Sequence, residues 1–304
     1  MRVSDLLSTL REEFLDDNVE PYKWSDPYLL RLLTVAQEQA ARRASLLYDT
    51  THATAADVYT GASTATTAGA LVDSAASFVS ATAVGKTVYN LTDDTFTTIS
   101  AFVSGTQLTL VDDIMASGDE YIIGDPDKAL TRICLVSGTH TYPMSTKVFK
   151  IGPCSLASDG IPMLQKTEEW LDRNYYGWRT TVGTPRFYIE REGSIRVVPY
   201  PNDDINEGTG KDTMILGVYR YPLVDILTST SSASPEIPAQ YHLGLLDHVC
   251  EIAFGKQDAD TYDAAKASRH AGLFIQKFGP PVSALVEQNI RKVPGLFILE
   301  PPKW

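Results

Sequence analysis

Residues 24–47 read WSDPYLLRLLTVAQEQAARRASLL, and they predict the first long element of the fold. Ser25 or Asp26 can cap a helix, and Pro27 suits its first turn, where the missing N–H leaves no hydrogen bond unmade. The apolar residues that follow are three or four positions apart, which predicts a helix with one apolar face. This face consists of Leu29, Leu33, Ala36, Ala40, Ala44 and Leu47. Its small alanines permit the close approach of a second helix.

Helical spacing also occurs at both ends of the chain. Residues 3–15 predict a short amphipathic helix that ends near residues 16–18. After Pro238, two apolar stripes predict two further helices, and Asp260 is placed to cap the second. We expect all of these helices to pack into one bundle. The side chains expected to pack it are Trp24, Leu29, Leu33, Ala36, Ala40, Leu246, Phe274 and Phe278.

The middle of the chain has a different composition. Residues 49–69 are rich in Thr, Ala and Gly and lack a period, which predicts a linker. Residues 70–124 are rich in β-branched and aromatic residues and are punctuated by turn residues, which predicts short strands. We place these strands near Thr87–Leu91, Thr95–Val103, Gln107–Val111 and Glu120–Ile123. A second β-rich region covers residues 130–225, and Thr167 is placed to cap one short helix within it.

These elements predict an α+β fold: a helical bundle formed by the N- and C-terminal helices, with a projecting β domain and a small inserted all-β module. Residues 1–50 and 235–280 would form the bundle. Residues 51–127 would form the linker and the inserted module, and residues 128–234 a β-rich domain with one short helix. Residues 281–304 are expected to form an extended C-terminal arm.

The expected C-terminal arm is apolar and bracketed by prolines. Such a segment is rarely left in solvent, so we expect it to occupy a groove on its own body or on a neighbouring molecule. The side chains expected to make this contact are Leu296, Phe297, Ile298, Leu299 and Trp304.

Acidic residues are unevenly distributed along the chain. The 304 residues include 38 Asp and Glu against 26 Lys and Arg, which gives a formal net charge of −12. Between Asp49 and Asp127 there are eleven acids and one base, Lys86, so this stretch alone contributes −10. A change of charge together with a change of residue types is typical of an inserted module. The acid excess argues against broad binding of nucleic acid, which requires clustered positive charge.

The cysteines and the apolar segments indicate the compartment. Cys134, Cys154 and Cys250 are odd in number and lie outside any CxxC motif, which argues against a disulfide framework and a structural zinc site. We therefore expect small buried side chains in a reducing compartment. The N-terminal segment lacks the apolar core of a signal peptide, and no segment reaches the length of a membrane span, so we expect no membrane association.

Motifs for catalysis and for cofactor binding are incomplete. Gly85-Lys86-Thr87 resembles the end of a phosphate-binding loop, but Ser80 stands where that motif needs a glycine. The histidines form no HxxxH or HExxH pair; they are His52, His140, His242, His248 and His270. Neighbouring acids such as Glu168 and Glu169 fit helix caps and solvated turns. We expect no catalytic residue, no metal and no cofactor, and hence no enzyme.

Aromatic residues gather in the second β-rich region. They are Tyr142, Trp170, Tyr175, Tyr176, Trp178, Phe187, Tyr188, Tyr200, Tyr219 and Tyr221. One interpretation is a stacking platform for a sugar or a base. The other is a core together with a protein–protein interface, where Tyr and Trp are enriched.

Three groups of segments resemble a known family. The first comprises residues 24–26, 29–30, 36–37 and 40–44 of the N-terminal helical region. The second comprises residues 237–242, 245–247, 253–254, 258–261, 266–267, 270 and 278–280. The third comprises residues 183–188 and 195–201. Together they resemble the head–tail adaptor (connector) proteins of tailed bacteriophages over most of the chain outside residues 50–125. The residues inside that range resemble an accessory β module that only some of these adaptors carry.

The resemblance implies a structural virion protein that is made in the host cytoplasm and placed at the head–tail junction. Such proteins assemble as a ring, usually of about twelve copies, beneath the portal protein. The ring continues the DNA channel, lets genomic DNA pass without specific binding, and offers a docking surface to a tail protein such as a nozzle. The resemblance carries no catalytic residues. The C-terminal arm would then insert into the portal or into a neighbouring subunit.

A second function class stays open. The chain could be a carbohydrate- or receptor-binding accessory virion protein that acts through its acidic β module or its aromatic residues.

Overall fold

The fold is described from a computed structural model, in residues 1–191, 193–226, 234–257 and 260–283. The chain divides into two compact units. The first combines Met1–Tyr48 with Tyr219–Ala284, and the described part of the second is Asp49–Val218. The two ends of the described chain therefore build one unit, and the middle builds the other.

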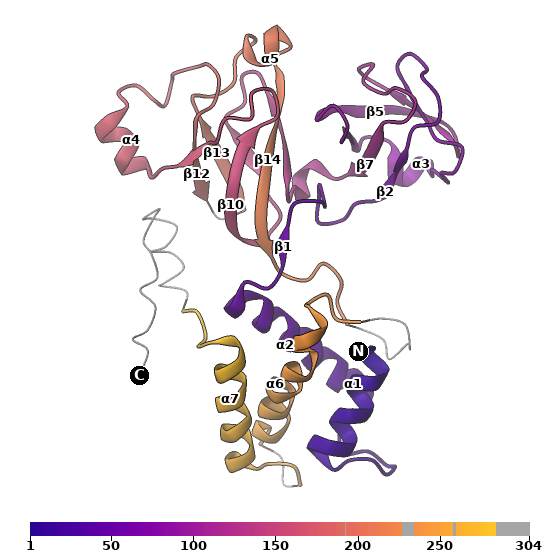
Figure 1. Cartoon of the computed structure of the whole chain (residues 1–304), viewed down its shortest axis with the longest axis vertical. Helices are drawn as coiled ribbons and strands as arrows, with labels where there is room; N and C mark the ends of the chain where they lie inside the picture. The colour runs from indigo at the N-terminus through magenta and orange to yellow at the C-terminus, as the bar shows by residue number, and fades with distance from the viewer. Residues whose placement is uncertain (192, 227–233, 258–259, 284–304) are drawn as a thin grey trace. The chain divides into compact units, whose positions relative to one another are not determined.

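The first unit, here called the helical unit, consists of α-helices with two irregular turns (Figure 1). Its first helix, α1 (Val3–Thr9), continues into a π-helical turn, η1 (Leu10–Leu15), and the two together cover residues 3–15, which were predicted to form one short helix. The chain leaves η1 at Asp16, whose φ of 50° is left-handed and ends the helix. The remaining elements are α2 (Asp26–Ala44), a 3-10 turn, η3 (Ala239–Tyr241), α6 (His242–Gly255) and α7 (Ala264–Phe278).

The core of the helical unit lies around α2 and α6. Leu29 and Leu33 of α2 and Leu246 of α6 are fully buried in one hydrophobic cluster. The helix α7 packs mainly on α6. Its N-cap is Asp263, which accepts hydrogen bonds from the N–H groups of Ala265 and Lys266, so the predicted cap at Asp260 is wrong. The helix begins only at Ala264, and a cap must directly precede the first turn. Asp260 therefore lies three residues too early in the chain to cap it.

In the second unit, the acidic stretch folds as a six-stranded antiparallel sheet in the order β2-β7-β4-β5-β6-β3. We call residues 49–127 the acidic module. Its strands are β2 (Tyr59–Ala62), β3 (Ala70–Val72), β4 (Thr87–Asn90), β5 (Thr95–Ser104), β6 (Gln107–Leu110) and β7 (Glu120–Gly124), with one short helix, α3 (Ser80–Ala83). The four predicted strands agree with β4 to β7 within one residue. Strand β2 lies in the segment predicted to be a linker.

Two four-stranded sheets follow the acidic module (Figure 1). One contains β1 (Tyr48–Asp49), β8 (Arg132–Val136), β10 (Val148–Leu156) and β14 (Lys211–Arg220). The other has the order β11-β12-β13-β9, with bounds Leu164–Gln165, Phe187–Arg191, Ser194–Val198 and Thr141–Pro143. Strands β12 and β13 form an antiparallel hairpin, and Gly193 supplies its left-handed turn with a φ of 65°. Apolar side chains of both sheets, such as Leu216 and Ile195, share one core.

Three short helical segments complete the second unit. They are η2 (Pro126–Lys128), α4 (Glu168–Asn174) and α5 (Ile205–Gly208). The hydroxyl of Thr167 accepts a hydrogen bond from the N–H of Trp170 at 3.1 Å, so the predicted cap of α4 is confirmed.

The predicted architecture, a helical bundle with projecting β structure, is wrong, although the α+β class is broadly compatible with the structure. The larger unit is β-rich and its described strands are almost all antiparallel. The helices do not form a clear bundle, because α7 packs mainly on α6 and the first helix passes into a π-helical turn. Apolar periodicity shows that a helix has a buried face, but it does not show which neighbours cover that face.

Candidate interaction surfaces

The contact between α6 and α7 depends on small and aromatic side chains. Phe274 and Phe278 of α7 are buried, and their rings lie 4.7 Å apart. A side chain at Gly244 of α6 would lie 2.9 Å from the Phe278 ring, so only glycine permits this approach. The ring of His248 stacks on Phe274 at 4.7 Å. These contacts fix the buried side of α7.

A buried carboxylate holds the same two helices together. Asp247 of α6 is 1% exposed, and it accepts hydrogen bonds from His270 Nδ1 at 2.9 Å and from Lys277 Nζ at 2.7 Å. Both partners come from α7, two turns apart, so one anion fixes the rotation of α7 about its axis. This site was not predicted from the sequence, because Asp247 and His270 are 23 residues apart on separate helices. The only sign in the sequence is that His270 and Lys277 are seven residues apart, which places both on the same side of one helix.

A buried cation shapes the connection between η1 and α2. The guanidinium of Arg11 donates to Asp17 at 2.8 Å, to Asp26 at 2.6 Å and to the Trp24 carbonyl at 2.8 Å. Asp17 in turn accepts from the N–H of Lys23 at 2.8 Å. This network holds the loop before α2 in place, and it too was not predicted from the sequence.

The eight side chains predicted to pack the helices lie in a single hydrophobic cluster of the helical unit. None is more than 4% exposed; they are Trp24, Leu29, Leu33, Ala36, Ala40, Leu246, Phe274 and Phe278. The five side chains predicted to contact the portal or a neighbouring subunit, Leu296, Phe297, Ile298, Leu299 and Trp304, lie outside the described residues.

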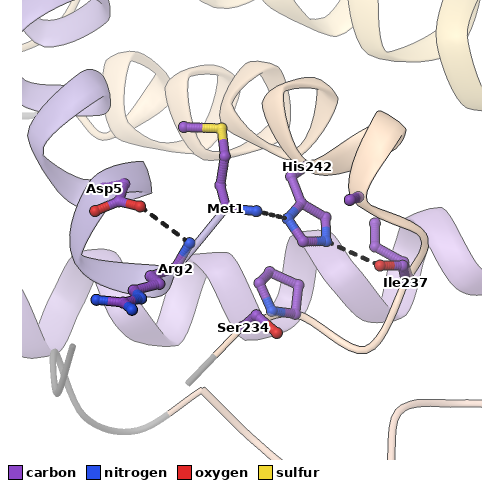
Figure 2. A pocket seen from close by; sticks show the side chains of 8 residues that line it. Met1, Arg2, Asp5, Ser234, Ile237 and His242 are labelled. Carbon is purple, nitrogen blue, oxygen red and sulfur yellow. Dashed lines mark hydrogen bonds between the residues drawn. The ribbon is translucent and has the colours of Figure 1, made fainter. Parts of the chain in front are cut away.

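A depression of about 440 Å³ opens in the helical unit beside the first residue (Figure 2). The Met1 amino group lies 3.0 Å from His242 Nδ1, and His242 Nε2 lies 2.8 Å from the Ile237 carbonyl. The amino group donates to Nδ1, so the imidazole donates from Nε2. Asp5 accepts from the N–H of Arg2 at 3.2 Å. The hydrogen bond between Met1 and His242 links the start of α1 to α6. The polar groups of the depression therefore stabilise the packing of these two helices.

A second cavity, of about 260 Å³, lies within the second unit, between the acidic module and β14. Lys211 Nζ donates to Asp112 at 2.6 Å, and Thr213 Oγ1 donates to the Asp94 carbonyl. The hydrogen bond from Lys211 holds the pKa of Asp112 below its usual range. The neighbouring Asp212 has a raised pKa, because burial penalises its charged form. Lys211 of β14 is thus already paired with a carboxylate of the acidic module.

Most carboxylates of the acidic module serve its own fold. Eight of its eleven acids accept hydrogen bonds: Asp49, Asp57, Asp73, Asp93, Asp112, Asp113, Asp119 and Asp125. Asp73 accepts from the buried Tyr121 hydroxyl at 2.7 Å, and Asp119 from the Ala116 N–H at 2.7 Å. The charge of −10 therefore stabilises turns and strand ends, and only a fraction of it faces solvent without a partner.

The aromatic residues do not form one platform. Tyr142 and Tyr188 lie in the core between the two four-stranded sheets. Trp178 is 2% exposed in a separate cluster, beneath the guanidinium groups of Arg179 and Arg196. Tyr176 is fully exposed. This distribution favours the interpretation of core and interface over that of a stacking platform.

The three cysteines are free. Burial raises the pKa of each of the thiols Cys134, Cys154 and Cys250 to about 12. All three therefore stay protonated at neutral pH and act as small apolar side chains. Within the described residues, no group of three or more His, Cys, Asp or Glu side chains could hold a metal ion. No helix found there is both long and apolar enough to cross a membrane.

A comparison with known families identifies the chain. A family model described as SU10 adaptor protein matches residues 66–285. The chain belongs to the SU10 adaptor protein family. A search of curated proteins finds no match. The predicted resemblance to phage adaptors is thereby confirmed at the level of the family.

The match covers most of the acidic module as well as the C-terminal helices. The acidic module from residue 66 onward lies inside the SU10 adaptor match, together with α6 and α7. The helices α1 and α2 precede the matched residues. As an SU10-family adaptor, the protein is a structural component of a bacteriophage virion and interacts with other virion components.

Proposed function

We propose that this SU10-family adaptor forms a ring of about twelve copies at the head–tail junction, between the portal protein and the tail. The observation that carries the proposal is the family match over residues 66–285. The ring would continue the DNA channel and offer its far side to a tail protein such as a nozzle. A closed ring repeats one contact around the cycle, so a modest contact gives a stable assembly.

We also propose that the protein acts by assembling with other virion proteins and does not catalyse a reaction. The support for this is that two of the titratable groups singled out in the sequence have structural partners. Glu168 pairs with Arg191 at 2.5 Å, and His248 pairs with Glu251 at 2.9 Å. A catalytic acid or base instead needs access to a substrate.

Genomic DNA is proposed to pass without specific binding. The support is that three arginines of the β-rich region are paired with carboxylates: Arg179 with Asp172, Arg186 with Asp159 and Arg191 with Glu168. Paired cations release few counterions from DNA and so contribute little affinity. We expect no shift of duplex DNA by the purified chain at roughly 50 mM salt. A salt-sensitive shift under that condition would contradict this part of the proposal.

The ring is tested by mixing the full-length chain with the portal protein of the same phage. We expect mass photometry to show a single added mass that corresponds to about twelve copies per portal ring. An addition of one or two copies, or a broad distribution, would overturn the ring.

The arm is tested separately. We propose that residues 281–304 insert into the portal or into a neighbouring subunit, through the apolar side chains around Phe297. A chain that ends at Gly279 should then lose portal binding while the helical unit keeps its thermal stability. Unchanged portal binding would exclude the arm as an anchor.

We favour the adaptor ring over a carbohydrate- or receptor-binding role. The aromatic residues are divided among separate cores, and most carboxylates of the acidic module are already hydrogen-bonded. Glycan-array binding by the full-length chain would support the alternative.

A further inference from the structure

The three long helices of the helical unit differ in how much of their surface the described structure covers. α6 has fourteen residues, of which ten are buried. α7 has fifteen residues, and only Phe274 and Phe278 are buried. Helices of this length owe most of their stability to tertiary packing rather than to propensity. α7 therefore has a large face that the described residues leave available for a partner.

The outer face of α7 combines small side chains with a cation. Ala265, Ser268 and Gly272 are exposed and recur at spacings of three and four, so they lie on one side of the helix. Ile275, which is 43% exposed, lies on the same side. Arg269 is exposed beside them and has no ion-pair partner among the described residues. Small residues permit a close approach of another helix. The charge of Arg269 favours a partner helix that carries carboxylates.

The first helix and its loop have the opposite charge. The exposed acids of this region are Asp5, Glu12, Glu13, Asp16 and Glu20, and we call them the acidic face. Glu12 and Glu13 lie on η1, and no cation pairs with them in the described structure. Val19, in the loop that follows η1, is 75% exposed and offers an apolar contact.

The two surfaces are placed for contact between copies. Figure 1 shows α7 on one side of α6 and α1 on the other, and α6 packs against both. The turn η1, which carries Glu12 and Glu13, also reaches α7, where the rings of Phe14 and His270 lie 6.0 Å apart. Two different complementary surfaces on one unit favour a head-to-tail contact, in which each copy uses one surface toward each neighbour. A two-fold contact would pair the same two surfaces reciprocally and close a dimer, so only the head-to-tail contact builds a ring.

We propose that α7 of one copy docks on the acidic face of the next copy, with Arg269 against Glu12 and Glu13. This inference rests on the proposed ring and specifies the contact that closes it. α2 is not available for this contact, because Leu29, Leu30, Leu32 and Leu33 are all buried within the unit.

Charge reversal on each surface tests the contact. Arg269→Glu, and separately Glu12→Arg with Glu13→Arg, should each weaken ring assembly on the portal by at least about tenfold, because like charges then face each other. Arg31→Glu is the matched control, since Arg31 is exposed on α2 and lies outside both surfaces. All changed residues are exposed, so thermal melting should stay unchanged and shows that each variant is folded.

Mixing the two charge-reversed chains is the decisive step. In an alternating ring, every junction would again pair a cation with an acid, so the mixture should assemble although neither variant assembles alone. A failure of rescue, or normal assembly of Arg269→Glu alone, would overturn the inference. If the wild-type chain forms no ring, the proposed function fails instead, so the two failures are distinguishable.

A competing occupant of α7 is the chain's own segment 284–304. Hydrogen exchange of α7 in the free full-length chain and in a chain ending at Ser283 separates the two. Equal exchange in both chains supports the contact between copies. Faster exchange of α7 in the shortened chain alone would assign the face to that segment and overturn the inference.

Discussion

The acidic module and the acidic face of α1 and η1 use carboxylates in opposite ways. In the acidic module, eight of eleven acids accept hydrogen bonds and hold turns and strand ends in place. On the acidic face, Glu12 and Glu13 are exposed and no cation of the described chain pairs with them. A formal charge of −10 can therefore be mostly structural, whereas a few free acids can carry an interaction.

The largest expected effect concerns Asp119 of the acidic module. Asp119→Ala removes the acceptor for the Asn90 side chain at 3.0 Å and for the Ala116 N–H at 2.7 Å. Since Asn90 is fully buried, we expect the free energy of unfolding to fall by about 2–3 kcal/mol. Urea unfolding measures the change, and the exposed neighbour Glu120→Ala is the control, with a change within about 0.5 kcal/mol. Equal losses of unfolding free energy in both variants would show that hydrogen-bonded and solvent-exposed acids do not differ in their contribution to stability.

A smaller loss of stability is expected at Asp247. This buried carboxylate holds α6 and α7 of the helical unit together, as Asp119 holds a turn of the acidic module. Asp247→Ala removes the acceptor of His270 and Lys277, and we expect a loss of about 2 kcal/mol together with faster hydrogen exchange in α7. Lys277 is 47% exposed and can return to water, which limits the loss. Unaltered exchange in α7 would show that the aromatic contacts alone hold this helix.

The Lys211–Asp112 pair should give a small, pH-dependent effect. Because the hydrogen bond from Lys211 lowers the pKa of Asp112, its contribution is present above the unfolded pKa of about 3.9 and is lost as the pH falls through the folded value. Both side chains are about two-fifths exposed, so Lys211→Gln should cost less than about 1 kcal/mol at pH 6. We expect the difference from the wild type to shrink below about pH 4 in urea unfolding. A constant difference would mean that the lysine acts through packing.

The smallest effect on stability is expected on the acidic face. Glu12→Gln with Glu13→Gln should leave the free energy of unfolding within about 0.5 kcal/mol of the wild type. A loss comparable to that of Asp119→Ala would show that these acids also serve the fold of their own unit. Calorimetry of the purified chain measures this change without any partner.

Strands of the acidic module were predictable where apolar alternation met clear turn residues. Strand β5 (Thr95–Ser104) begins at the predicted Thr95, directly after the turn residues Asp93 and Asp94. Strand β2 was missed because its residues, Tyr59–Ala62, alternate only between half-buried and exposed, and because its pairing with β7 is a long-range contact. Propensity over a short window does not contain such a contact.

The interaction surfaces were less predictable than the fold. The sequence indicated which side chains of α2, α6 and α7 are apolar, and eight of these lie in one core. It did not indicate that α2 is covered far more completely than α7, because coverage depends on which helices become neighbours. Nor did it separate bound from free carboxylates: Asp119 and Glu120 are adjacent in sequence, and only Asp119 is buried.

The construction of the helical unit from Met1–Tyr48 and Tyr219–Ala284 has a consequence for synthesis. The ribosome must translate the whole second unit before α2 can meet α6, which takes roughly ten to thirty seconds at the usual elongation rates. During that time Leu29 and Leu33 lack their final partners and are accessible to chaperones. The β-rich unit can fold first, and the helical unit is complete only when the last residues of α7 have left the ribosome.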